Sequence, residues 1–148
     1  MFQEPAVIPA TVDHKVIVAS VVPEARRLGF LSDTFGSCFM LVEASVCEWM
    51  ERLCPEYHGG QGGLWDFIEL SSGGGYLAPT GSDCYNIRLE GHGVDGCLGA
   101  SAAGIVVTAF ALSSLVWQGC ETLCERHGQL IEYADQHPEA AAIRQAIG

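Results

Sequence analysis

The feature that most constrains this chain is the apolar stretch Ala100–Trp117, which directly follows a glycine-rich run at residues 91–99. Coiled as a helix, the stretch is apolar on nearly every side, and such a helix is stable only when it is buried. It carries Ser101, Gly104 and Thr108, and it is near or short of the length that spans a bilayer. We therefore expect a core helix packed against a sheet, and no membrane span.

The size and composition fit one folded unit. The chain has 148 residues, of which 49% are hydrophobic, and its mean hydropathy is +0.23. A chain of this length buries enough surface for one core, and it is too apolar to remain disordered. We expect a single domain over residues 1–148, with a poorly defined N-terminal segment at residues 1–22.

The charge balance is strongly acidic. Eighteen Asp and Glu residues stand against seven Lys and Arg residues, the formal net charge is −11, and Lys15 is the only lysine. Binding to phosphate backbones needs clustered Lys and Arg side chains, so we expect no direct binding of nucleic acid. Two interpretations remain open: carboxylates that mimic the phosphates of DNA, or an ordinary solvated acidic surface.

The cysteine pattern predicts thiols rather than a disulfide framework. The chain has seven cysteines, an odd number, and its first residues lack the features of a secretory signal. We therefore expect a cytoplasmic protein with reduced thiols. Cys120, Cys124 and His127 could share one helical face around a metal, but the chain has no CxxC motif, so packed thiols and no cofactor are expected.

Periodicity and breaking residues predict an α+β protein. Helices are expected at residues 23–27 (ended by Gly29), 39–53, 100–117 (with Ser101 as the N-cap), 121–127 and 130–136 (separated at Gly128), and from 139 to 147. Strands are expected within residues 12–22 around 16–18, at 65–70, 76–78 and 84–90, and at 96–98 after an Asp95-Gly96 turn. The short links between strands favour antiparallel pairing. The predicted fold is a small antiparallel meander of three to four strands packed against several helices, with a central apolar helix.

Glu43 does not follow the polar pattern of its helix. At 100° per residue it projects between Phe39, Val46 and Met50, inside the apolar stripe. A buried carboxylate needs a partner, so we expect an ion pair with Arg26, Arg27 or Arg88, or a hydrogen bond from a loop amide. A catalytic carboxylate is the alternative.

One pair of residues could support nucleophilic catalysis. Cys97 could act as the nucleophile with His92 as its base and Asp95 to orient the imidazole, which requires direct hydrogen-bond contact. The alternative is a packed thiol in a strand. Gly91, Gly93 and Gly96 have the spacing of a dinucleotide fingerprint, but they lack the βαβ context and the acidic residue that such a site needs, so we interpret them as turn residues.

The order of short motifs resembles that of the KlcA/ArdB antirestriction proteins from about Arg26 to Gly148. The matching blocks are residues 26–31, 35–36, 39–40, 43–44, 49–50, 52–54, 63–65, 67, 70–71, 75–79, 90–91, 93, 95–96, 102–106, 133–134 and 137–143. Each block is ordinary, but their order and spacing together are specific.

The resemblance implies a small cytoplasmic α+β protein of conjugative plasmids and other mobile elements. Such proteins relieve type I restriction, so that incoming unmodified DNA survives. The family is not known for enzymes, so no catalytic residue is transferred, and the expected partner is the type I restriction-modification complex or an associated host protein. Candidate partner-contact or structural positions are Glu43, Trp65, Glu90, His92 and Asp95. A small Cys/His-dependent hydrolase and an acidic DNA mimic are the alternative functions.

Overall fold

The protein is an arrangement of five strands and five α-helices over the residues that the computed structural model describes, 16–57, 65–89, 91 and 93–148. Short 3₁₀ turns at Glu24–Arg26 and Gly36–Cys38 precede the first two helices. In chain order the elements are β1 (Ala19–Val21), α1 (Arg27–Phe35), α2 (Phe39–Leu53), β2 (Trp65–Leu70), β3 (Gly75–Pro79), β4 (Cys84–Leu89), β5 (Val94–Gly99), α3 (Ala100–Trp117), α4 (Leu123–Ala134) and α5 (Ala140–Ile147).

The strands form two small antiparallel sheets. One has the order β1-β2-β3, in which Ile68 lies opposite Val21 on one side and Tyr76 on the other. The second is the β4–β5 hairpin, in which Leu89 lies opposite Val94. The predicted α+β class with antiparallel strands is confirmed, and the strands divide between two sheets instead of continuing as one meander.

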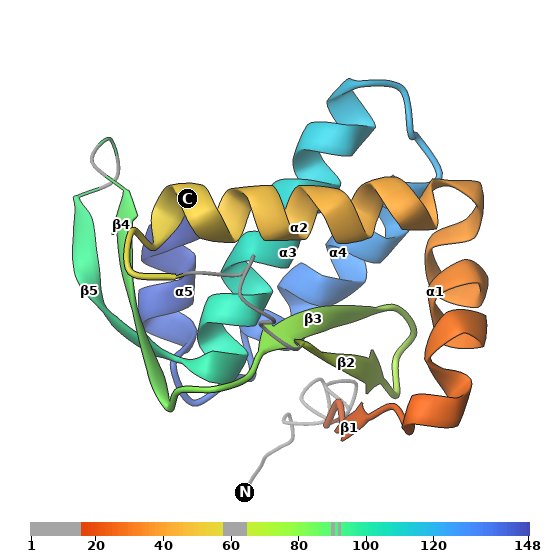
Figure 1. Ribbon diagram of the computed structural model, residues 1–148, viewed down its shortest axis with the longest axis horizontal. Coiled ribbons are helices and arrows are strands. Elements are labelled where there is room, and N and C mark those ends of the chain that lie inside the picture. Colours follow the sequence, from red (N-terminus) through yellow and green to blue (C-terminus); the bar gives the residue numbers. More distant parts are fainter. Residues whose placement is uncertain (1–15, 58–64, 90, 92) are drawn as a thin grey trace, which may run out of the picture.

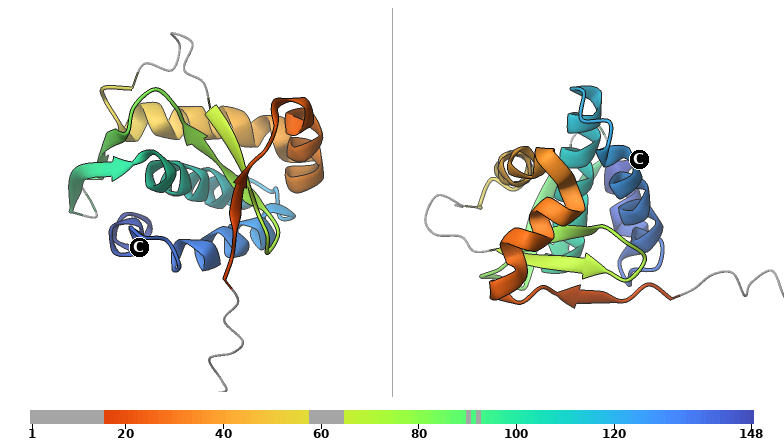
Figure 2. Two further views of the ribbon diagram at one scale, coloured as in Figure 1. Left: turned by 90° about the horizontal axis from the view of Figure 1, so that it is seen from below. Right: turned by 90° about the vertical axis from the view of Figure 1, so that its right-hand side faces the viewer.

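Helix α3 lies in the centre of the protein. Figure 2 shows it as the middle layer, between α2 on one side and α4 and α5 on the other, and it also packs against β3. Its length and hydropathy would suit a bilayer, yet 61% of it is buried within the protein. The expectation of a central apolar helix is confirmed, because neighbours on several sides explain why no side of it is polar.

Helix α2 covers α3 with a narrow apolar stripe. Val42, Val46, Met50 and Leu53 are buried, and the Trp49 ring stacks on Phe110 of α3 with centroids 4.9 Å apart. The predicted helix is confirmed, but the predicted burial of Glu43 is wrong, because this side chain is exposed.

The reason lies in where the stripe is centred. At 100° per residue its axis passes between Val42 and Val46, and Glu43 falls beyond its edge. The Phe39 end of the helix, which made the stripe look wider, is only half-buried.

Two glycines lie inside helices that were expected to stop at them. Helix α1 continues through Gly29 to Phe35, and α4 continues through Gly128 to Ala134. Glycine weakens a helix by only about 1 kcal/mol, and burial of the flanking apolar side chains outweighs that cost. Phe30, Leu31 and Leu130 are such side chains.

Two strand boundaries also differ from expectation. The first strand begins at Ala19, after Val16-Ile17-Val18, although the Val18 amide and carbonyl still bond to Ser71. The Asp95-Gly96 pair lies within β5 and is not a turn, because the ladder already pairs Arg88 with Asp95 and Ile87 with Gly96. Among the described residues between β4 and β5, Gly93 has a left-handed backbone, with φ +68°.

Candidate functional site

The β4–β5 hairpin presents one buried face and one exposed face. Figure 1 shows it at the end of the protein where α2 ends. Tyr85, Ile87 and Leu98 point into the core and are 7%, 0% and 5% exposed. The opposite face carries Cys84, Asn86 and Arg88 on β4 and Asp95 and Cys97 on β5, all exposed. The three buried side chains form an apolar anchor that fixes the hairpin to the core, and the opposite face is a polar, exposed surface.

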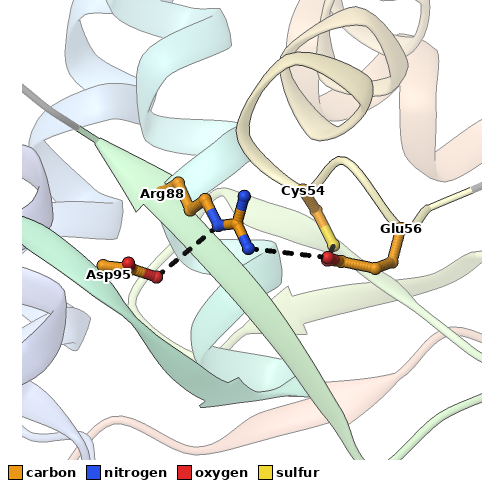
Figure 3. Close-up of polar contacts among 4 residues, drawn as sticks. All are labelled: Cys54, Glu56, Arg88 and Asp95. Carbon is orange, nitrogen blue, oxygen red and sulfur yellow. Dashed lines mark hydrogen bonds and ion pairs between the residues drawn. The ribbon is translucent and has the colours of Figure 1, made fainter.

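Arg88 is the centre of a charged cluster on that face. Its Nε lies 3.6 Å from Oδ1 of Asp95 across the hairpin, and its Nη2 lies 3.9 Å from Oε2 of Glu56 beyond the end of α2 (Figure 3). The Cys54 thiol also contacts the Glu56 carboxylate at 3.9 Å. All three charged side chains are more than half exposed, so each ion pair contributes little to stability.

The same face carries a disulfide between Cys84 and Cys97. The expectation that all thiols are reduced is therefore wrong for this pair, whereas the other five cysteines are free. Cys97 is also exposed rather than packed. While its sulfur is bonded to Cys84, Cys97 offers no thiolate for the nucleophilic attack considered above.

A second polar arrangement lies where α3 begins. The Ser101 hydroxyl is 2.8 Å from the Tyr76 hydroxyl of β3 and 3.0 Å from Nε2 of His137, which precedes α5. Ser101 is thus not the predicted N-cap, a position that Gly99 takes. His137 is half-buried. Sequence reasoning missed this group because its members lie 25 and 36 residues apart from Ser101.

The tautomer of His137 decides what this group can do. The backbone N–H of Glu139 donates to Nδ1 of His137 at 3.0 Å, so Nδ1 is the unprotonated nitrogen and the neutral ring carries its proton on Nε2. That Nε2–H donates to Ser101 and cannot accept the proton of the hydroxyl, as a general base would. Burial lowers the pKa of His137, against an opposing effect of the Glu139 carboxylate, and favours this neutral form. The arrangement is a hydrogen-bonded brace.

Close backbone contacts surround this brace. A Cβ on Gly104 would lie 2.4 Å from the Leu77 carbonyl oxygen, so only glycine lets α3 approach β3 this closely. One turn further on, the fully buried Thr108 hydroxyl accepts from the Leu77 N–H at 3.2 Å. At the start of α3 the Gly99 N–H donates to the Glu139 carboxylate at 3.1 Å. We call the group Tyr76, Ser101, Gly104, Thr108, His137 and Glu139 the α3 seam.

The five predicted candidate positions do not form one cluster among the described residues. Asp95 lies on the exposed hairpin face, and Glu43 is exposed on α2. Trp65 is 9% exposed, and its Nε1–H donates to the Tyr57 hydroxyl at 2.9 Å. Glu90 and His92 lie outside the described residues.

The structure adds one exposed aromatic residue that sequence reasoning passed over. Trp117 is 89% exposed at the end of α3, which projects beyond α2 (Figure 1). The sequence placed it at the end of an otherwise buried helix, and its large apolar area in water is unusual for that position. Exposed tryptophans are frequent energetic centres of protein interfaces.

The described arginines are all engaged within the protein. Four pair with carboxylates, the Arg52 guanidinium lies over the Trp49 ring at 4.6 Å, and Arg126 donates to the Thr34 carbonyl at 2.8 Å. The four ion-paired residues are Arg26, Arg27, Arg88 and Arg144. No cluster of uncommitted cations therefore occurs in the part of the chain that the structure describes.

The three residues considered for a metal do not share one helix. Helix α4 begins at Leu123, so Cys120 lies before it, while Cys124 and His127 lie within it. Within residues 16–57, 65–89, 91 and 93–148, no group of three or more His, Cys, Asp or Glu side chains is placed to hold a metal ion.

Comparison with known proteins shows to which class this fold belongs. A family model described as "Antirestriction protein" matches residues 56–148. An antirestriction protein KlcA of Escherichia coli is 44% identical over 88% of this chain and 93% of the relative. A putative antirestriction protein, YubI of Escherichia coli strain K12, is 36% identical over 85% of this chain and 92% of the relative. The chain belongs to the antirestriction protein family.

Within that family the chain is of the KlcA/ArdB type. A solved structure matches it with a TM-score of 0.82 and 42% identity, over 90% of this chain and 96% of the other. That structure comes from work on KlcA and ArdB proteins, which are described as having a novel fold and antirestriction activity against type I DNA restriction systems in vivo but not in vitro. The resemblance inferred from the motifs is confirmed.

Proposed function

We propose that this protein relieves type I restriction in the cytoplasm as one domain that binds another protein and catalyses no reaction. The observation that carries the proposal is the structural match at 42% identity, which extends over 90% of the chain. Relief of restriction would protect incoming unmodified plasmid DNA during transfer.

The charges of the described residues support a protein partner over direct DNA binding. The arginines are already engaged with carboxylates, a ring or backbone oxygen, and the net charge is −11. Binding to phosphate backbones depends on free cations that displace counterions. A partner that offers basic side chains suits this surface better.

The exposed hairpin face and Trp117 are the contact regions that we propose. Asp95 is charged and exposed, and Trp117 is an exposed aromatic anchor. The solved relative acts in vivo but not in vitro, which supports a target that includes a component of the living cell besides the restriction enzyme itself.

The test is the plating efficiency of unmodified phage on a host with a type I restriction system and on a matched host without one. Expression of the protein is expected to raise plating on the restricting host and to have no effect on the other host. Relief should increase with the amount of protein, as expected for stoichiometric binding. Absence of any relief at high expression would overturn the proposal.

Two variant pairs locate the contact. Trp117→Ala is compared with Met40→Ala, another exposed apolar residue at 69% exposure, and Asp95→Lys is compared with Glu132→Lys, an exposed acid on α4. We expect Trp117→Ala and Asp95→Lys to lose relief while both controls retain it. Equal relief by all four variants would exclude both regions as the contact surface.

A further inference from the structure

The Cys84–Cys97 bond crosses the hairpin diagonally at its base. In the ladder Cys84 lies opposite Gly99, and Cys97 lies opposite Asn86, so the two cysteines are diagonal neighbours on the exposed face. Their Cα atoms are 5.8 Å apart, within the range that disulfides require. The bond therefore forms between strands already held in register by the ladder.

The fold of the hairpin does not depend on this bond. Tyr85, Ile87 and Leu98 anchor the opposite face in the core, and six opposed residue pairs already close the loop between the strands. A cross-link stabilises mainly by restricting the unfolded chain, so its loss lowers the cost of unfolding but removes neither the ladder nor the apolar anchor of the folded hairpin. Both half-cystines are exposed, and small thiols can reach the sulfurs.

The bond lies close to the junction between β5 and α3. Cys97 precedes Gly99 by two residues, and Gly99 is the N-cap of α3 and donates to Glu139 of the α3 seam. Breaking the bond leaves this seam in place but removes the covalent link between the two strands at the base of the hairpin. The exposed outer part is then held by the ladder, the apolar anchor and the solvated ion pairs of Arg88 with Asp95 and Glu56.

Two of the other thiols are poorer candidates for such exchange. Burial, together with Glu43 and Glu51, raises the pKa of Cys47, and burial raises the pKa of Cys54. Thiol–disulfide exchange proceeds through the thiolate, so these thiols react slowly. Cys38, Cys47, Cys54, Cys120 and Cys124 are free in the same protein that holds the exposed bond.

We propose that Cys84 and Cys97 form a reversible redox switch that sets the mobility of the β4–β5 hairpin, with glutathione-type thiols and disulfides as its reactants. In reduction, a glutathione thiolate attacks one sulfur, the protein S–S bond breaks, and the other cysteine leaves as a thiolate. A second glutathione thiolate attacks the mixed disulfide, which gives glutathione disulfide and the second protein thiolate. Two glutathiones thus supply two electrons, and oxidation is the reverse.

The first test counts thiols in the full-length protein. The protein is equilibrated in glutathione buffers from oxidising to reducing, quenched with acid, unfolded and alkylated. The number of alkylated cysteines is then determined by mass spectrometry. We expect five alkylated cysteines in the oxidising buffer and seven in the reducing one, and five reactive thiols in both for the Cys84→Ser/Cys97→Ser double variant. The matched control Cys124→Ser, at an exposed free cysteine, should keep the change of two. A count that stays at five or at seven for the unaltered chain would overturn the switch.

The second test measures amide hydrogen exchange in the two redox states. Reduction should speed exchange in residues 84–89 and 94–99, while amides in the middle of α3 keep their protection. The double variant should match the reduced protein in both buffers. Identical exchange of the hairpin in the two states would refute control of its mobility, whatever the thiol count shows. Neither test depends on relief of restriction, so the outcome is separate from that of the proposed function.

Discussion

The α3 seam and the β4–β5 hairpin meet at Gly99, yet the two regions are held together by opposite means. In the α3 seam, the backbone of α3 at Gly104 lies very close to the backbone of β3, and Thr108 is fully buried. In the hairpin, the ladder and buried side chains fix only the inner face, while the exposed face carries solvated ion pairs and one disulfide. The contrast shows where sequence change is constrained by packing and where the protein can vary its surface without loss of the fold.

The largest expected effect follows from filling the space at Gly104. The first added carbon would lie 2.4 Å from the Leu77 carbonyl oxygen and 2.8 Å from the Ala78 Cα, and neither backbone atom can move alone. We expect Gly104→Val to lower the free energy of unfolding by about 2–4 kcal/mol, or to prevent folding. Urea denaturation followed by circular dichroism measures this loss.

Gly128 provides the matched control for that variant. It is exposed within α4, and a Cβ there meets no atom within 4 Å. Gly128→Ala should raise the free energy of unfolding by about 0.5–1 kcal/mol, because alanine is the better helix former. If the two variants changed the free energy of unfolding similarly, close packing would not be what constrains Gly104 in the α3 seam.

An intermediate effect is expected from pH. The pKa of His137 in the folded protein is lowered from 6.5 by burial, so between that value and its folded pKa the unfolded chain binds more protons than the folded one. The contribution of His137 to the free energy of unfolding is therefore complete above pH 6.5 and is lost as the pH drops below that value. Protonation of Nδ1 would also place two N–H donors against each other, so the Glu139 N–H would lose its hydrogen-bond acceptor on His137.

The measurement is urea denaturation at several pH values between 8 and 5.5. His127 contributes in the same direction, because burial lowers its pKa too. Consequently His137→Gln should reduce the slope of stability against pH, and adding His127→Gln should reduce it further. An unchanged slope in the His137 variant would show that the seam does not hold this histidine neutral.

The smallest effect on stability is expected in the hairpin. Arg88→Ala breaks the contacts with both Asp95 and Glu56, but all three side chains are more than half exposed. We expect a loss of at most about 0.5–1 kcal/mol, which salt should reduce further. Thermal unfolding in low and high salt measures it. A loss as large as that of Gly104→Val would mean that the hairpin is as tightly constrained as the seam.

The sequence predicted best those elements whose own side chains determine them. An apolar run without a polar side identified α3, and the spacing of Val42, Val46 and Met50 identified α2. Gly29 and Gly128 misled the helix boundaries because their cost is local, whereas the burial that overrides it depends on distant neighbours.

The polar contacts were harder to predict, since they join residues far apart along the chain. Ser101 and His137 meet only after α3, α4 and α5 have packed, and no local pattern reports this. The disulfide would have been easier to predict, because both strands that carry its cysteines were expected. Placing the turn at Asp95-Gly96 hid the ladder register that makes Cys84 and Cys97 neighbours.

The contact between Gly99 and Glu139 has a consequence for how the chain matures at the ribosome. The start of α3 is bonded by a residue that lies 40 positions further on, and the last helix supplies Ile143 and Ala146, both fully buried. Translation must therefore be nearly finished before the central helix is enclosed. A nascent or prematurely terminated product would leave that apolar surface open to chaperones and proteases.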